Sequence, residues 1–272
     1  MSELLLGKNI PYEANYNPDL LMPVPRLQSR VANGIDYPLP FKGLDIWNAW
    51  EVSWLNDKGK PQVASAKFEY SAESLNIIES KSFKLYLNSL NQAKFASEEE
   101  LAETLKNDLS RVTESHVTVT LYAADDKWPG LSSTKAKCID DLDISIDQYQ
   151  LAPEVLKGAL SSLDDKTSEQ LVSHLFKSNC MVTGQPDWAS VYINYTGRAI
   201  GHENLLKYLI SFRQHKAFHE PCVERIFIDL MSYCTPDALS VYCRYTRRGG
   251  IDINPYRSTS NEIPSNLRMW RQ

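Results

Sequence analysis

The feature that most constrains the fold of this chain is an internal repeat. The segment GKPQVASAKFEY at 59–70 aligns with GQPDWASVYINY at 184–195, and five of the twelve aligned positions are identical. Similarity at a fixed spacing indicates supersecondary units that are repeated along a chain. We therefore expect two copies of one structural module.

The same order of hydrophobic patterns follows each copy. Apolar residues recur at the spacing of two consecutive helices, and a strand-like run comes after them. These patterns cover 83–90, 101–109 and 116–123 after the first copy, and 205–212, 223–231 and 238–246 after the second.

A further strand pattern precedes each copy. Within the tryptophan-rich residues 47–56, Trp50, Val52 and Trp54 recur with a period of two, which is typical of a half-buried strand. Residues 172–180 alternate less regularly and, taken alone, fit a helix equally well, but the repeat favours a strand. Each half therefore predicts the order strand, strand, helix, helix, strand.

These patterns predict an α+β fold of two tandem modules, each with antiparallel strands and two helices on one face. We expect the first residues, which are rich in proline and asparagine, to lie over the surface. The expected organisation is an N-terminal extension at 1–40, an N-terminal module at 41–123, a connector at 124–168 and a C-terminal module at 169–272.

Charge and composition argue against several classes of protein. The formal net charge of −5 disfavours nonspecific binding of nucleic acid, which needs a basic face. No apolar run approaches the roughly 18 residues of a membrane span, and the first residues lack the apolar core of a signal peptide. Five cysteines without a CxxC pair are typical of a reduced, cytoplasmic protein rather than of a disulfide framework or a zinc ribbon.

Each copy carries polar residues that the other lacks, which suggests one composite site. Cys180 aligns with Leu55, and Asp187 aligns with Gln62. The predicted hairpin folds Cys180 and Asp187 toward one small substrate. An ionised thiol adds to a carbonyl or nitrile carbon, and a carboxyl group can then supply a proton. A buried apolar cysteine and an ordinary turn aspartate are the alternatives.

Two basic segments are candidate anion sites. The SKS segment at 80–82 begins a predicted helix, whose free N–H groups and positive dipole end suit a phosphate. A serine cap with a solvated lysine explains it equally well. The RRGG segment at 247–250 combines guanidinium groups with backbone that a ligand can approach closely. A basic turn after a strand is the alternative.

Acidic, histidine and cysteine residues near the helix starts have more than one interpretation. Glu79 and Glu220 each precede or begin a predicted helix, where the helix dipole stabilises a carboxylate. A carboxylate also accepts the two N–H groups of a guanine-like edge. His219 and Cys222 have an HxxC spacing that could bind zinc together with Cys180, but no fourth ligand is obvious, and we predict no metal. Neither a GxGxxG nor a GxxxxGK[ST] motif is present, so a Rossmann or P-loop site is not supported.

Four separated motifs together resemble the NADPH-dependent 7-cyano-7-deazaguanine reductases, the nitrile reductases of the queuosine pathway. The resemblance runs from about residue 40 to the C-terminus and is to the longer, two-module form of that family. The motifs are ESKSFKLY at 79–86, Cys180 followed by Gly-Gln-Pro up to Asp187, FHE at 218–220 and RRGG at 247–250.

The resemblance implies a fold, a reaction and a set of residue roles. The fold is the tunnelling fold (T-fold), in which such modules assemble side by side around a central channel. The reaction reduces a nitrile to a primary amine, 7-aminomethyl-7-deazaguanine, by two hydride transfers from two NADPH. Cys180 would form a covalent thioimide, and Asp187 would donate the proton. The implied substrate-binding residues are Glu79, Ser80, Lys81, His219 and Glu220, with Phe218 stacking on the base, and the implied cofactor-binding residues are Lys81, Ser82, Arg248 and Gly249.

The same features predict binding partners and an oligomeric state, and they leave other functions open. We expect a small-molecule substrate, no direct contact with nucleic acid or membrane, and a homodimer or higher homo-oligomer, because the edge strands of such modules need neighbours. Two other functions stay open: a purine or pterin cyclohydrolase on the same fold, and a noncatalytic base-binding module. The zinc-dependent cyclohydrolases need a fuller ligand set than Cys180, His219 and Cys222 readily supply.

Overall fold

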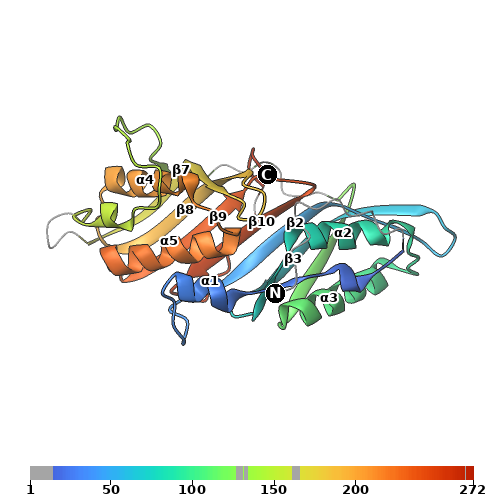
Figure 1. Ribbon diagram of the computed structural model, residues 1–272. Helices are drawn as coiled ribbons and strands as arrows, with labels where there is room; N and C mark the ends of the chain where they lie inside the picture. Colours follow the sequence, from blue (N-terminus) through green and yellow to red (C-terminus); the bar gives the residue numbers. More distant parts are fainter. Residues whose placement is uncertain (1–14, 127–130, 132–133, 161–165, 267) are drawn as a thin grey trace. The chain divides into compact units, whose positions relative to one another are not determined.

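The structure is a computed structural model that describes residues 15–126, 131, 134–160, 166–266 and 268–272 (Figure 1). The chain divides into two compact units, and each is described by itself. The first unit contains Met1–Gln28, Asp45–Gly130 and Arg247–Ile253. The second unit contains Ser29–Leu44, Leu131–Thr246 and Asn254–Gln272.

The first unit has the predicted order of strands and helices. Its main strands lie in the order β5, β3, β2, and β3 pairs with β5 antiparallel. Two short strands, β1 and β4, form a separate antiparallel pair that the sequence patterns did not predict. The elements are η1 (Pro18–Leu20), β1 (Pro23–Pro25), β2 (Lys42–Leu55), β3 (Pro61–Ser71), β4 (Asn76–Ile78), α2 (Ser80–Ser89), η2 (Leu90–Gln92), α3 (Glu98–Thr113) and β5 (Val117–Ala123).

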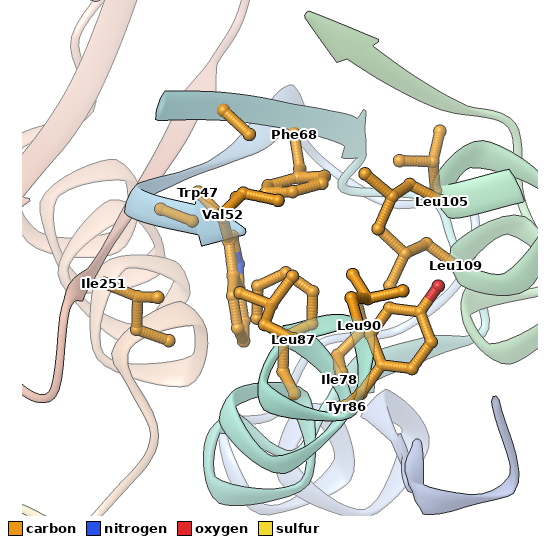
Figure 2. Packing of buried hydrophobic residues seen from close by; sticks show 14 of the residues in the cluster. Trp47, Val52, Phe68, Ile78, Tyr86, Leu87, Leu90, Leu105, Leu109 and Ile251 are labelled. Carbon is orange, nitrogen blue, oxygen red and sulfur yellow. The ribbon is translucent and has the colours of Figure 1, made fainter. Parts of the chain in front are cut away.

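Aromatic and leucine side chains form the core of the first unit (Figure 2). The ring of Phe83 on α2 packs edge-on against Trp47 and Phe68, with ring centroids 5.4 and 5.1 Å apart. Leu105 and Leu109 of α3 are fully buried, as the predicted helical stripe requires. Each fully buried side chain of this size contributes about 1.5–3 kcal/mol of transfer free energy, so this packing fixes α2 and α3 on the strands.

The second unit repeats the same order. Its strands lie in the order β10, β9, β8, β7, β6, and all neighbours are antiparallel except β6 and β7, which pair parallel. The ambiguous segment at 172–180 is strand through Asn179, so the repeat favoured the correct structure. The elements are β6 (Lys137–Cys138), η3 (Pro153–Leu156), β7 (Lys166–Asn179), β8 (Pro186–Arg198), α4 (His202–Ser211), η4 (Phe212–Gln214), α5 (His219–Cys234), β9 (Ala238–Tyr245) and β10 (Ile251–Ser258).

The predicted α+β class, with antiparallel strands and two long helices in each module, is confirmed. Of the expected N-terminal extension, residues 1–14 lie outside the described part of the chain, and the rest is not wholly at the surface. Helix α1 (Arg26–Ala32) lies in this segment, and Arg26 and Arg30 are buried. Strand β7 begins at Lys166, inside the segment expected to be the connector. None of the helices among the described residues has the length and apolar character needed to cross a bilayer.

Buried ion pairs explain why these N-terminal residues are inside. In the first unit, Arg26 on α1 donates to the buried carboxylate of Asp45. In the second unit, Arg30 and Arg257 both donate to Glu224, with N–O distances of 2.8 and 2.9 Å. A buried charge is tolerated only when an opposite charge and hydrogen bonds compensate its lost hydration. Each arginine is therefore held by a specific carboxylate.

Candidate active site

A tight turn between β7 and β8 positions Cys180 and Asp187 in the second unit. The N–H of Cys180 donates to the carbonyl of Gln185 at 2.8 Å, and the N–H of Gly184 donates to the carbonyl of Cys180 at 2.9 Å. On the strands below, Ser178 and Asp187 are direct partners in the β7–β8 register. Cys180 is 4% exposed and Asp187 is 6% exposed. The thiol and the carboxyl therefore belong to one hairpin and are both largely shielded from water.

The turn corrects the sequence alignment at this point. In the first unit the N–H of Asn56 donates to the carbonyl of Lys60, and the N–H of Gly59 donates to the carbonyl of Asn56. Asn56 thus has the hydrogen-bonding position that Cys180 has in the second unit, and the second turn is longer by one residue. Cys180 is therefore equivalent to Asn56 and not to Leu55, as the ungapped repeat had suggested.

The end of β7 also contacts the segment that leads into α5. The N–H of Asn179 donates to the carbonyl of His215 at 2.8 Å, and the N–H of Ala217 donates to the carbonyl of Asn179 at 3.2 Å. This short parallel bridge runs into Cys180 on one side and into Phe218, the N-cap of α5, on the other. It brings the first residues of α5 beside the β7–β8 turn.

His219, the first residue of α5, pairs with Asp187. Its Nε2 lies 3.6 Å from Oδ2 of Asp187, and its ring stacks on Tyr245 with centroids 3.6 Å apart and planes at 3°. The buried Nδ1 of His219 has no hydrogen-bond partner among the residues that the structure describes. A buried imidazole nitrogen of this kind suits a polar group of a bound ligand, because leaving it unpaired is costly.

Three further side chains, those of Cys222, Ser178 and Tyr245, lie buried close to Asp187 and His219. Burial raises the pKa of Cys222 to about 12, although the nearby hydroxyl groups of Ser178 and Tyr245 act in the opposite direction; the nearby Asp187 and Glu220 raise it further. Burial also raises the pKa of Tyr245. Burial therefore keeps the Cys222 thiol protonated at neutral pH.

Glu220, the second residue of α5, is 2% exposed and lies close enough to Cys222 to act on its pKa. The structure thus brings together Cys180, Asp187, His219 and Glu220, which the sequence singled out as separate motifs. Tyr245 and Ser178 were missed, because they lie on β strands that show only the ordinary alternation of half-buried residues. Cys180 and Asp187 come from the β7–β8 hairpin, and His219 and Glu220 come from the start of α5.

In the first unit, Glu79 is the N-cap of α2. Its Oε1 accepts the N–H of Lys81 at 2.8 Å, and its Oε2 accepts the N–H of Ser82 at 2.7 Å. The side chain is fully buried. A carboxylate at this position satisfies two free N–H groups and interacts favourably with the helix dipole. Glu79 therefore has a clear structural task besides the substrate contact that the resemblance implies.

Ser82 lies inside the first unit. Its hydroxyl donates to the carbonyl of Glu79 at 2.7 Å and accepts the N–H of Met22 at 3.0 Å, and its side chain is fully buried. The resemblance implies that Ser82 contacts the cofactor; in this structure its hydroxyl also supports the start of α2. Ser80 and Lys81 are half-buried and lie at the surface of the same turn.

The RRGG segment forms the turn between β9 and β10. Gly249 and Gly250 have φ values of 65° and 82°, which favour glycine. A Cβ at Gly249 would lie 3.1 Å from Cε and 3.3 Å from Nζ of Lys84 on α2. This turn and Lys84 border a hollow of about 180 Å³, which Asn88 and the carboxylate of Glu51 also line.

Lys84 is the residue of this region that sequence reasoning missed as a separate candidate. It lies one helical turn after Lys81, so both ammonium groups lie along one side of α2. Cationic side chains beside a glycine turn suit the phosphate groups of a dinucleotide. These residues of the first unit therefore suit an anionic part of a cofactor. The carboxylate of Glu51 would repel an anion placed next to it.

The chain is similar to known proteins over most of its length. The family model described as nitrile reductase, 7-cyano-7-deazaguanine-reductase N-term, matches residues 12–121, and the model described as QueF-like protein matches residues 186–263. The chain is 50% identical over 269 residues to the NADPH-dependent 7-cyano-7-deazaguanine reductase of Hydrogenovibrio crunogenus, with 98% of this chain and 96% of that protein covered. The apo crystal structure of the archaeosine synthase QueF-Like aligns at 16% identity with a TM-score of 0.31, over 38% of this chain and 100% of that one.

The class of protein is thus an α+β enzyme. The match to a full-length relative shows more. The chain belongs to the family of the NADPH-dependent 7-cyano-7-deazaguanine reductases, which confirms the resemblance seen in the sequence.

Proposed function

We propose that the chain reduces the nitrile of 7-cyano-7-deazaguanine to the primary amine of 7-aminomethyl-7-deazaguanine, with oxidation of two NADPH, in tRNA queuosine biosynthesis. The observation that carries the proposal is the buried thiol of Cys180 and the buried carboxyl of Asp187 at one turn. The 50% identity to a named reductase supports the choice of substrate and cofactor.

Cys180 is the proposed nucleophile. Its Sγ adds to the nitrile carbon, so that a C–S bond forms and one C–N π bond breaks, which gives a covalent thioimide. The nitrile nitrogen gains negative charge in this step and takes up a proton. A nitrile accepts hydride poorly, whereas the C=N bond of the thioimide accepts it readily; NADPH, when bound, supplies the hydride. Cys180 leaves as a thiolate when the C–S bond breaks after the first reduction.

Asp187 is the proposed proton donor to that nitrogen, and the proton released by the thiol restores its acid form. Asp187 faces His219 across 3.6 Å, so the imidazole can hold the carboxyl group in place and pass on a proton. Both Cys180 and Asp187 are buried. This shielding protects the reactive imine from hydrolysis between the two reductions.

The remaining roles follow the resemblance and the local structure. We assign binding of the deazaguanine base to His219 and Glu220, supported by the buried Nδ1 of His219. Glu79, Ser80 and Lys81 keep the substrate-binding role that the resemblance implies. For the cofactor we assign Lys81, Arg248 and Gly249, with Ser82 acting through the backbone of α2.

Intact-mass spectrometry tests the central step. Incubation with 7-cyano-7-deazaguanine alone should raise the protein mass by one substrate, because the thioimide accumulates when no reductant is present. Cys180→Ala should bind the nitrile without this increase. Cys222→Ala is the matched control, since its buried, protonated thiol is not expected to react, and this variant should still form the adduct.

Two results would overturn the proposal. An adduct that persists in Cys180→Ala would remove Cys180 as the nucleophile, and no adduct in the unaltered protein would remove the thioimide. A count of NADPH oxidised per amine formed tests the stoichiometry separately, with two expected.

We also propose that the enzyme acts in the cytoplasm as a homodimer or higher homo-oligomer. Strand β5 supports this, because it lies at the edge of its sheet and pairs with β3 alone among the described strands. An unpaired strand edge is usually covered by another chain or element. Light scattering at micromolar concentration should give at least twice the mass of one chain, and a monomer would contradict the proposal.

A further inference from the structure

A short edge strand in the second unit carries residues that the proposed reaction does not use. Strand β6 consists of Lys137 and Cys138, which pair with Leu171 and Val172 of β7. One further backbone hydrogen bond, from the N–H of Ile139 to the carbonyl of Val172 at 3.0 Å, continues this pairing. So few backbone bonds hold an edge strand weakly, which raises the question of what fixes it on β7.

Three potential metal ligands meet where β6 leaves the sheet. One ligand atom each from Cys138, Asp140 and His174 lies within 4.8 Å of the other two, and these residues form the one such group among those that the structure describes. A tetrahedral zinc ion with bond lengths of about 2.0–2.3 Å separates its ligand atoms by about 3.3–3.8 Å. Small side-chain rotations would therefore bring the three atoms to bonding distance.

Hydrogen bonds already orient two of these ligands. The carboxylate of Asp140 accepts the hydroxyl of Ser173 at 2.7 Å and the N–H of His174 at 2.8 Å. The Nδ1 of His174 lies 2.7 Å from the hydroxyl of Ser190, a buried residue of β8. When Nδ1 donates this hydrogen bond, the lone pair of His174 is on Nε2, which is the usual arrangement of a histidine that binds metal.

We propose that Cys138, Asp140 and His174 bind one divalent transition-metal ion, preferably Zn²⁺, with water as the fourth ligand. A thiolate, an imidazole and a carboxylate together suit zinc, whereas magnesium and calcium prefer oxygen ligands alone. The ion joins β6 to β7 and so fixes the edge of the sheet. It has no part in the nitrile reduction.

Titration with Co²⁺ under reducing conditions tests the proposal, because cobalt replaces zinc and reports a bound thiolate by a charge-transfer band in the near ultraviolet. We expect one equivalent per chain and displacement of the band by Zn²⁺. Cys138→Ala should abolish the band, and Asp140→Asn and His174→Gln should weaken binding strongly. Ser190→Ala, which removes only the partner of His174, should weaken binding about 10–100-fold.

A matched control separates this site from the metal set considered from the sequence. In Cys180→Ala the cobalt spectrum should be unchanged, because Cys180 belongs to the β7–β8 turn. A spectrum that depends on Cys180, or one that survives in Cys138→Ala, would overturn the proposal. So would the absence of saturable Co²⁺ and Zn²⁺ binding to the unaltered protein. Circular dichroism of each variant shows that its fold is intact.

Discussion

At the level of single residues, the surroundings of Asp187 decide what its carboxyl group can do. The side chain is buried beside the imidazole of His219, and His219 is itself held flat against Tyr245. A carboxyl group that is shielded from water and oriented by a neighbour is well placed to transfer a proton to a bound substrate. The same carboxyl group on an exposed turn would have no such constraint.

Asp187→Asn tests this role with almost no change in shape. The amide cannot donate a carboxylic proton, so kcat should fall by about 10²–10⁴-fold, the usual contribution of general acid–base catalysis. Steady-state oxidation of NADPH gives the measurement. Asp57→Asn, in the exposed turn of the first unit, is the control and should keep full activity. A kcat close to that of the unaltered enzyme in Asp187→Asn would exclude the carboxyl group as the proton donor.

The sequence predicted part of this constellation and missed the rest for a clear physical reason. Cys180 and Asp187 lie within one hairpin, so their proximity follows from the turn alone. The stacking of His219 on Tyr245 joins the start of α5 to the end of β9, and only tertiary packing brings these together. The resemblance implied Ser82 as a cofactor contact, and nothing in its motif shows that its hydroxyl also accepts the N–H of Met22.

At the level of secondary structure, the start of α2 depends on one side chain. Both carboxylate oxygens of Glu79 are engaged by N–H groups of the first turn, whereas Gly201, the equivalent N-cap of α4, has no side chain to offer. The two modules thus begin the same helix in different ways. The long helices were predictable from their apolar stripes, while β1, β4 and β6 contain too few residues to show a pattern.

Glu79→Ala should therefore destabilise the protein as well as affect any contact with substrate. Loss of a helix N-cap costs about 0.5–2 kcal/mol of unfolding free energy. Urea denaturation followed by circular dichroism measures this cost. Glu98→Gln, on the exposed first turn of α3, is the control and should leave stability nearly unchanged. Unaltered stability together with weaker substrate binding in Glu79→Ala would show that Glu79 acts on the ligand alone.

At the level of the whole molecule, residues far apart in the chain belong to one unit. Arg30, near the N-terminus, and Arg257, near the C-terminus, share the carboxylate of Glu224 in the interior of the second unit. The two guanidinium groups also lie over the ring of Phe41, at 5.7 and 5.5 Å from its centroid. Such a network cannot be recognised in one sequence, because its members have no fixed spacing.

Removal of the shared carboxylate should be costly. In Glu224→Ala, two buried guanidinium groups lose their common counter-charge, and breaking a buried pair in this way costs about 3–5 kcal/mol. Glu103→Ala, which breaks the exposed pair with Lys106, is the control and should cost less than about 1 kcal/mol. Chemical denaturation gives both values. A loss in Glu224→Ala no larger than in the control would show that the network adds little to stability.

Neither unit consists of one uninterrupted stretch of chain. Ser29–Leu44 belongs to the second unit although it precedes most of the first, and Arg247–Ile253 belongs to the first although it follows most of the second. A cut in the middle of the polypeptide would therefore leave each fragment without a piece that the other half supplies. Because of these exchanged segments, we expect that neither unit can fold from its own half of the chain, and that both must be present in one polypeptide.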